Sequence, residues 1–234
     1  MIAAIHQPNF FPWLGYFSKI YKADIFVFLD EVQFPRTGKG SWVNRVRVLN
    51  NNKSVWLTCP VARNKSTPLI KNVYMAEGNW RQKTLQRLQG TYAKTPKFKE
   101  IFPFIEALVR HKDDNLARFN IHAIKRIAKL LALNIRWLKQ SELTDREIHK
   151  LQGSARLAAV CKSINATTYL AGDGAHGYED PEAYRKNGIK LATSGFQCLE
   201  YKQSRTDSFL PGLSVIDALF HVGPEGTRRL IVDS

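Results

Sequence analysis

The sequence predicts an α/β protein whose open, mainly parallel sheet carries a β-hairpin insertion and a helical subdomain. Short apolar runs alternate with segments that have apolar residues at helical spacing, the pattern of parallel strands joined by helices. The 234 residues are 44% hydrophobic and 24% charged, an ordinary globular composition. This length fits one α/β domain over residues 1–234.

The first elements predict a strand, loop, helix and strand. Residues 2–5 are an apolar strand that ends at His6, and residues 14–23 have the apolar spacing of a helix. Residues 25–29 form an apolar run that reads as a strand buried on both faces and ends at Asp30. A helical crossover places two such strands side by side and parallel. We therefore expect a Rossmann-like sheet built outward from these strands.

A basic β-hairpin insertion is expected at about 32–75. Residues 43–49 and 54–60 have strand character and flank the sequence Asn50-Asn51-Asn52-Lys53. Asparagine tolerates the positive φ angles of a tight hairpin turn. A helical subdomain is then expected at about 79–133, with helices near 79–90, 97–110 and 113–133.

The remaining chain returns to alternating elements. We predict a strand at 135–138, a helix at 146–163, a strand at 168–171, a short helix at 181–187, a strand at 189–193 and a helical run from 213. Gly223-Pro224-Glu225 predicts a turn that opens the last short helix.

The charge is concentrated in one part of the chain. The 35 Lys and Arg against 20 Asp and Glu give a net charge of +15, and residues 36–99 hold 14 of these cations and one acid, Glu77. Such a basic segment favours phosphate-bearing partners, although it could also be a solvated surface. With the interspersed Trp42, Trp56, Tyr74 and Trp80, it could also contact nucleic acid.

Several classes of protein are not supported. The apolar runs are too short for a membrane span, the N-terminus lacks the features of a secretory signal, and the three cysteines are far apart. We therefore expect a cytoplasmic protein with reduced thiols. No nucleophile signature of the G-x-S-x-G type and no metal-binding spacing of the six histidines occur, so no metal site is predicted.

Two long motifs carry a family resemblance. They span His6–Ile20 and Leu213–Glu225, and shorter agreements occur at 24–30, 42–45, 168–172 and 188–189. The chain resembles the WbqC-like protein family over nearly its whole length. This resemblance implies a cytoplasmic sugar-modifying enzyme of bacterial surface-polysaccharide (O-antigen) synthesis, in particular an aminoacyl or acyl transferase.

The candidate catalytic residues lie at strand ends and in one apolar helix. In open parallel sheets, ligands bind beyond the carboxyl ends of strands, so the loops at His6, Asp30 and Gly172-Asp173-Gly174 should meet in one crevice. His6 could take a proton from an attacking sugar amine, or be a loop histidine held by backbone groups. Asp30 or Asp217 could orient His6. Asp217 lies in an apolar run, so it must be paired, for example with an arginine, or face a polar cleft.

Other residues are candidates for binding substrate or phosphate. The fork of Arg45 suits phosphate oxygens, with Lys39 and Asn44 beside it. Asp173 could bind a ribose or sugar hydroxyl next to Gly172. The remaining candidates lie around the first helix start and are Gln7, Trp13, Gly15 and Tyr16.

A remoter likeness concerns the same helix start. In nucleotidylyltransferase-type proteins an H-x-G-H element there contacts phosphates, whereas this chain has Trp13-Leu14-Gly15-Tyr16 without either histidine. The glycine could still let a phosphate approach the helix N-terminus. Alternatively, Pro12-Trp13 is only a packing device at the helix start. The likeness thus favours a nucleotide-binding fold with altered chemistry.

Two functions follow from these observations. The first is acyl or aminoacyl transfer to the amine of a nucleotide-linked amino sugar, with a CoA thioester, an aminoacyl-tRNA or a carrier-protein thioester as donor. The alternative is a nucleic-acid (tRNA) binding protein, or a nucleotide-binding protein with a nucleotidylyltransferase-like fold. The sequence does not identify the sugar, the acyl group, the donor or the oligomeric state.

Overall fold

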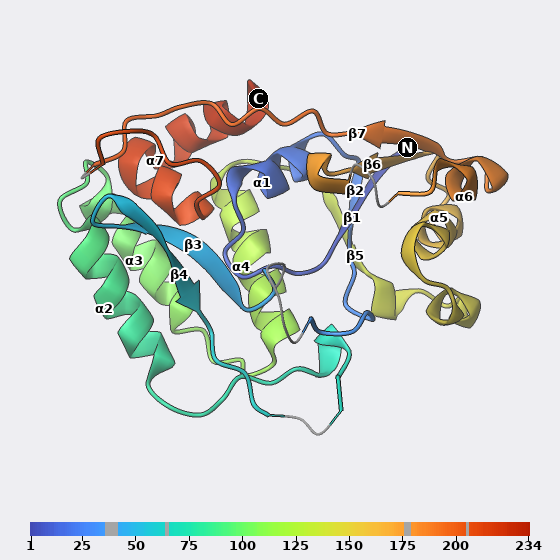
Figure 1. The fold of residues 1–234 in the computed structure, drawn as a ribbon, viewed down its shortest axis with the longest axis horizontal. Helices are drawn as coiled ribbons and strands as arrows, with labels where there is room; N and C mark the ends of the chain where they lie inside the picture. The colour runs from blue at the N-terminus through green and yellow to red at the C-terminus, as the bar shows by residue number, and fades with distance from the viewer. Residues whose placement is uncertain (36–41, 64–65, 176–178, 205) are drawn as a thin grey trace.

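The sheet is parallel and has the predicted α/β architecture. The computed structural model describes residues 1–35, 42–63, 66–175, 179–204 and 206–234 (Figure 1). Within these residues, five strands form one sheet in the order β5-β2-β1-β6-β7, and every neighbouring pair is parallel. The strands are β1 (Ile2–His6), β2 (Ile25–Phe28), β5 (Arg136–Lys139), β6 (Thr168–Ala171) and β7 (Lys190–Thr193).

This strand order creates a switch point between β1 and β6. The chain leaves β1 through helix α1 (Leu14–Tyr21), adds β2 and then β5 on one side, and returns to add β6 and β7 on the other side. In this second part of the sheet, helix α5 (Gly153–Ser163) precedes β6, and helix α6 (Pro181–Lys186) lies between β6 and β7 in the chain. Connections that diverge from two adjacent strands leave a crevice at the carboxyl ends of those strands.

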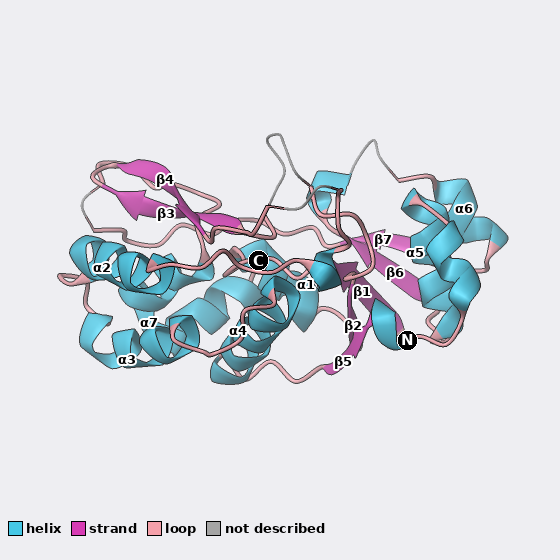
Figure 2. Ribbon diagram, turned by 90° about the horizontal axis from the view of Figure 1, so that it is seen from below, coloured by secondary structure: helices cyan, strands magenta, loops and turns pink. Residues whose placement is uncertain are grey.

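Alternation along the central strands produces two separate hydrophobic clusters. Ala4 and Phe26 point into a large cluster with α1, whereas Ile5 and Val27 point into a smaller one that includes Ala158 of α5. Figure 2 shows the sheet between α1 and α4 on one side and α5 and α6 on the other. The central strands are apolar on both faces because helices cover both of them.

The predicted hairpin is present as β3 (Arg45–Asn50) and β4 (Lys53–Thr58). Asn51 and Asn52 both have positive φ, 44° and 63°, as a two-residue type I′ turn requires. The hairpin lies over the helical part of the molecule (Figure 2), where the Leu49 amide donates to Tyr92 Oη over 3.1 Å. It is therefore attached to the helical subdomain and not to the parallel sheet.

The helical subdomain is also confirmed. Its helices are α2 (Trp80–Tyr92), α3 (Phe98–Val109) and α4 (Leu116–Leu130), and α7 (Val215–Val232) packs with them. The ring of Tyr92 on α2 stacks on Phe220 of α7, with centroids 4.9 Å apart. Residues far apart in the sequence therefore share this core.

Two glycines decide where helices break. The helix predicted at 146–163 is a 3-10 turn (Arg146–Lys150) followed by α5, because Leu151 and Gln152 between them are extended and Gly153, the first residue of α5, has a φ of 52°. Within α7, Gly223 has a φ of 71° and a ψ of −178°, which separates the last helical segment as the Gly-Pro pair predicts.

Candidate functional site

A cavity of about 450 Å³ lies at the carboxyl ends of β1 and β6, where the strand order reverses. We call it the switch-point cavity. Six residues singled out from the sequence line it, namely His6, Trp13, Gly15, Tyr16, Gly172 and Asp173. The fold therefore brings together side chains from the end of β1, the start of α1 and the loop after β6.

His6 ends β1 and faces this cavity as a neutral ring. Its Nδ1 lies 3.2 Å from the carbonyl oxygen of Gln7, which can only accept, so Nδ1 carries the proton and Nε2 keeps its lone pair. Burial, together with the positive charge of Lys19, lowers the pKa of His6 to about 3. At neutral pH His6 is thus an uncharged hydrogen-bond acceptor and a weak base.

Lys19 also lines the cavity, although it is not among the candidates predicted from the sequence. It lies on α1, is only 3% exposed, and donates from Nζ to the carbonyl oxygen of Ile5 over 2.9 Å. Burial lowers the pKa of Lys19 to about 8, and Glu179 and Asp173 oppose that shift only through space. The sequence does contain one indication of this position. Lys19 follows Tyr16 by three residues, so both side chains lie on one face of a helix.

Asp173 lines the switch-point cavity from the loop after β6 and binds the loop after β7. Its carboxylate accepts hydrogen bonds from Ser194 Oγ (2.6 Å) and from the amides of Gly195 (2.8 Å) and Phe196 (2.9 Å). Burial alone would raise its pKa, but these three bonds hold the pKa of Asp173 below its usual range. Asp173 is therefore an ionised group that ties the loop after β7 to the cavity.

The two lining glycines have different roles. A Cβ added at Gly15 would lie 2.7 Å from Trp13 Nε1 and 2.9 Å from the Phe196 ring, so the missing side chain makes room for protein. A Cβ added at Gly172 would meet no atom within 4 Å, so the space beside it is open. A phosphate, which the sequence predicts to approach at Gly15, therefore finds more room beside Gly172.

The loop between β1 and α1 is held by the start of α7. Ser214 Oγ donates to the carbonyl oxygen of Phe11 over 2.7 Å, and the Val215 amide donates to that of Pro12 over 2.8 Å. Phe11 has a φ of 41°, a left-handed conformation that is unusual for an aromatic residue. The two longest sequence motifs thus meet in space, and one positions the other at the cavity.

Comparison with known proteins identifies the family of the chain. The profile of the WbqC-like protein family matches residues 7–229. The chain belongs to the WbqC-like protein family. It is also 26% identical over 231 residues, 97% of its own length and 96% of the other protein, to "Uncharacterized protein Rv1507c" of Mycobacterium tuberculosis. No solved structure matches the chain significantly.

In this WbqC-like protein, Asp30 is not brought to the switch-point cavity. It is 3% exposed and accepts hydrogen bonds from the Ser141 amide (3.0 Å) and Ser141 Oγ (2.6 Å). Burial raises the pKa of Asp30, and the bonds from Ser141 oppose that shift. The loops after β1 and β6 share one cavity as expected, whereas Asp30 joins the ends of β2 and β5.

Asp217 also lies apart from His6, in a buried network on α7. Its Oδ2 accepts from Tyr201 Oη over 2.6 Å and from Gln203 Nε2 over 3.0 Å. His221 donates from Nδ1 to the Asp217 carbonyl oxygen over 2.7 Å and accepts at Nε2 from the Ser204 amide over 2.8 Å. The partners are a tyrosine and an amide in place of the expected arginine, and they attach segment 201–204 to α7.

Of the predicted phosphate contacts in the basic segment, Asn44 and Arg45 lie at the start of the hairpin and do not line the cavity. Asn44 donates from Nδ2 to the Cys59 carbonyl oxygen over 3.0 Å, and the Arg45 guanidinium lies 4.3 Å from the Trp56 ring centroid. Lys39 falls outside the described residues. The backbone carbonyl oxygen of Gln7 accepts a hydrogen bond from Tyr16 Oη over 3.0 Å.

Two features are absent from the part of the chain that the structure describes. No group of three or more His, Cys, Asp or Glu in that part of the chain is arranged to hold a metal ion. Likewise, none of the described helices combines the length and the apolar character that crossing a membrane requires.

Proposed function

We propose that the protein is a cytoplasmic transferase of bacterial surface-polysaccharide precursor synthesis, which moves an acyl or aminoacyl group to the amine of a nucleotide-linked amino sugar. The observation that carries this proposal is the switch-point cavity, where Lys19 and His6 face one space beside the first turn of α1. Nucleotides bind at this position of doubly wound sheets.

The charge around the cavity supports an anionic substrate. Helix α1 has no acidic residue in its first turn, and no side chain caps its N-terminus. Free amides at a helix start favour phosphate. A sugar phosphate placed there would have its hydroxyl groups near Asp173.

In this proposal the chemistry is direct transfer. The amine nitrogen attacks the carbonyl carbon of the donor, the new C–N bond forms, and the bond from that carbon to the leaving sulfur or oxygen breaks. His6 Nε2 accepts a hydrogen bond from the amine and orients it. The proton that the nitrogen loses passes to the neutral form of Lys19, whose pKa of about 8 suits this task better than the pKa of about 3 at His6.

Thermal shift and turnover assays test the proposal. A nucleotide-linked amino sugar is expected to raise the melting temperature, and His6→Ala is expected to abolish turnover without large destabilisation. If nucleotide sugars, CoA and nucleotides all leave the melting temperature unchanged and the protein binds RNA with a strong salt dependence, the proposed enzymatic function is rejected.

A second candidate function rests on the hairpin. The guanidinium groups of Arg45 and Arg47 lie 4.3 and 5.2 Å from the Trp56 ring centroid, and Trp42 links Trp56 to Trp13 with centroid separations of 5.2 and 5.3 Å. Basic and aromatic side chains in series suit a nucleic-acid strand. An aminoacyl-tRNA donor would unite this surface with the cavity. RNA affinity that falls steeply between 50 and 200 mM salt, at roughly the slopes known for phosphate contacts, is the expected sign.

A further inference from the structure

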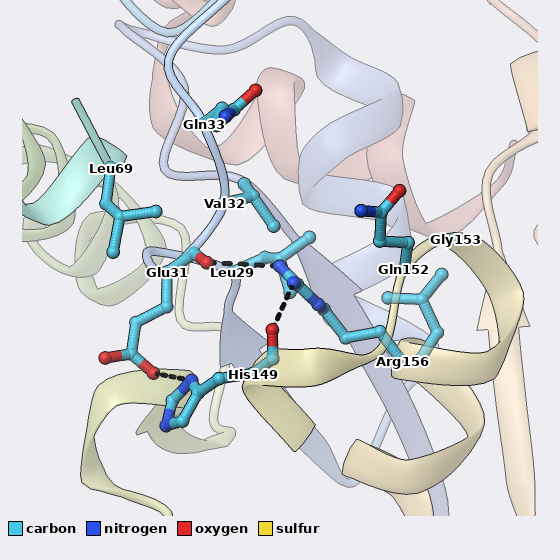
Figure 3. A pocket seen from close by; sticks show the side chains of 10 residues that line it. Leu29, Glu31, Val32, Gln33, Leu69, His149, Gln152, Gly153 and Arg156 are labelled. Atoms are coloured by element: carbon cyan, nitrogen blue, oxygen red, sulfur yellow. Dashed lines mark hydrogen bonds and ion pairs between the residues drawn. The ribbon is translucent and has the colours of Figure 1, made fainter. Parts of the chain in front are cut away.

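A second cavity, of about 570 Å³, lies at the end of β2 beside the start of α5 (Figure 3). We call it the β2 cavity. Four aliphatic side chains, Leu29, Val32, Leu69 and Leu157, form much of its wall. Its size falls within the range of small-molecule and cofactor sites, about 300–1,000 Å³.

The β2 cavity and the switch-point cavity share a pair of strand ends. The Leu29 amide donates to the His6 carbonyl oxygen over 2.8 Å, directly after the β1–β2 ladder ends at His6 and Phe28. Leu29 lines the β2 cavity, and His6 lines the switch-point cavity. A two-substrate reaction needs such neighbouring sites.

Arg156 supplies a fixed cation to the β2 cavity. Its guanidinium donates to three carbonyl oxygens, those of Leu151 (2.7 Å), Glu31 (3.1 Å) and His149 (3.1 Å), and two of these contacts are drawn in Figure 3. A guanidinium has five N–H groups, so two are left. In the described part of the chain no carboxylate pairs with Arg156, and the Glu31 carboxylate is already paired with Lys71 and with His149. Among the described residues, Arg156 therefore has no ion-pair partner, and the Glu31 carboxylate acts on it only through space.

The polar lining also includes two carboxamides, beside the Glu31 and His149 side chains that are paired with each other. Gln33 and Gln152 border the β2 cavity from the loop after β2 and from the residue before α5. Each can donate and accept hydrogen bonds, which matches an amide in a ligand. The cavity thus combines an arginine without an ion-pair partner among the described residues, two carboxamides and an aliphatic wall.

We propose that the β2 cavity binds the phosphopantetheine arm of a thioester acyl donor. The phosphate contacts Arg156, the amides of the arm contact Gln33 and Gln152, and its dimethyl group packs against the aliphatic wall. This inference rests on the proposed transfer reaction. The sugar amine forms a C–N bond to the acyl carbon, the C–S bond breaks, and the arm leaves as a thiolate that takes up a proton.

Calorimetric titration with 4′-phosphopantetheine and with pantetheine, which lacks the phosphate, tests the inference. Phosphopantetheine is expected to bind about tenfold or more tightly, the scale of one charge-assisted contact. Arg156→Gln should remove this difference, and Arg185→Gln on the exposed face of α6 should leave it unchanged. Because Arg156 also holds three carbonyl groups, Leu157→Trp provides an independent variant that fills the cavity and should block both probes.

The arm could be part of CoA or of a carrier protein. Titrations with CoA and with a phosphopantetheine-bearing carrier protein distinguish these two sources, and the unmodified carrier protein is the control. Equal binding of both probes to the wild type, or unchanged binding to Arg156→Gln and Leu157→Trp, would overturn the inference, as would acceptance of aminoacyl-tRNA alone. A parallel titration with nucleotide sugar separates the two proposals. Phosphopantetheine binding without nucleotide-sugar binding supports the β2 cavity and rejects the proposed acceptor, and the converse result overturns only this inference.

Discussion

The ammonium of Lys19 on α1 donates a hydrogen bond to the carbonyl oxygen of Ile5 at the end of β1, over 2.9 Å. This contact places a buried cation beside His6. Burial lowers the pKa of both side chains, and the positive charge of Lys19 lowers the pKa of His6 further. In the proposed reaction only the neutral form of Lys19 accepts a proton. We therefore expect kcat/KM to rise with pH through about 8.

Lys19→Met tests that expectation directly. The substitution keeps an unbranched chain of nearly the same length and removes the titrating group. Turnover should therefore fall by about 10²-fold or more, within the usual contribution of general base catalysis, and the rise near pH 8 should disappear. Lys129→Met, on the exposed face of α4, is the matched control. An unchanged pH profile in Lys19→Met would show that another group takes the proton.

Acid should destabilise the protein partly through His6. Its pKa is about 3 in the folded state and near 6.5 when unfolded, so the stabilising contribution is present above pH 6.5 and is lost as the pH falls toward 3. From pH 7.5 to 5.0 the free energy of unfolding should fall by up to about 2 kcal/mol more in the wild type than in His6→Gln. Urea titrations at both pH values measure this difference, and equal losses would contradict the assignment.

The two glycines of the cavity should respond differently to alanine. Gly15→Ala forces a methyl group against Trp13 and Phe196, so we expect a loss of about 1–3 kcal/mol of stability. Gly172→Ala meets open space and should unfold at nearly the wild-type temperature. Similar melting temperatures for both variants would contradict the packing described around Trp13.

Asp217 should be a structural residue. Asp217→Ala leaves the Tyr201 hydroxyl and the Gln203 amide without their acceptor, and the loss of such a buried network costs about 3–5 kcal/mol. The milder Asp217→Asn should retain turnover in proportion to the folded fraction. Full stability with abolished turnover in Asp217→Asn would instead return this residue to the catalytic candidates.

Local patterns in the sequence were sufficient for the strands and turns of the fold. The run before His6 and the Asn51-Asn52 pair predict a strand and a turn because apolar alternation and positive φ are local properties. They also place His6 and Asp173 at strand ends, and the switch point brings these two residues together. The sequence order alone does not show that β6 lies beside β1.

Other parts of the site depend on contacts between distant segments. Lys19 resembles a surface lysine in the sequence, and its burial arises from the packing of α1 against the end of β1. Asp217 finds Tyr201 and Gln203 on a segment without regular structure, which no periodicity could locate. The distance of Arg45 from the cavity follows from the hairpin packing on α2, which is also a tertiary contact.

Binding of a nucleotide-linked amino sugar in the switch-point cavity is tested most directly by calorimetric titration of this sugar into the wild type, Gly172→Leu and Gly90→Leu. Both glycines have open space around an added Cβ, but Gly172 lines the switch-point cavity and Gly90 lies on the exposed side of α2. Binding in the switch-point cavity predicts that Gly172→Leu loses affinity by about tenfold or more, whereas Gly90→Leu binds as the wild type does. Equal binding by all three proteins would contradict it.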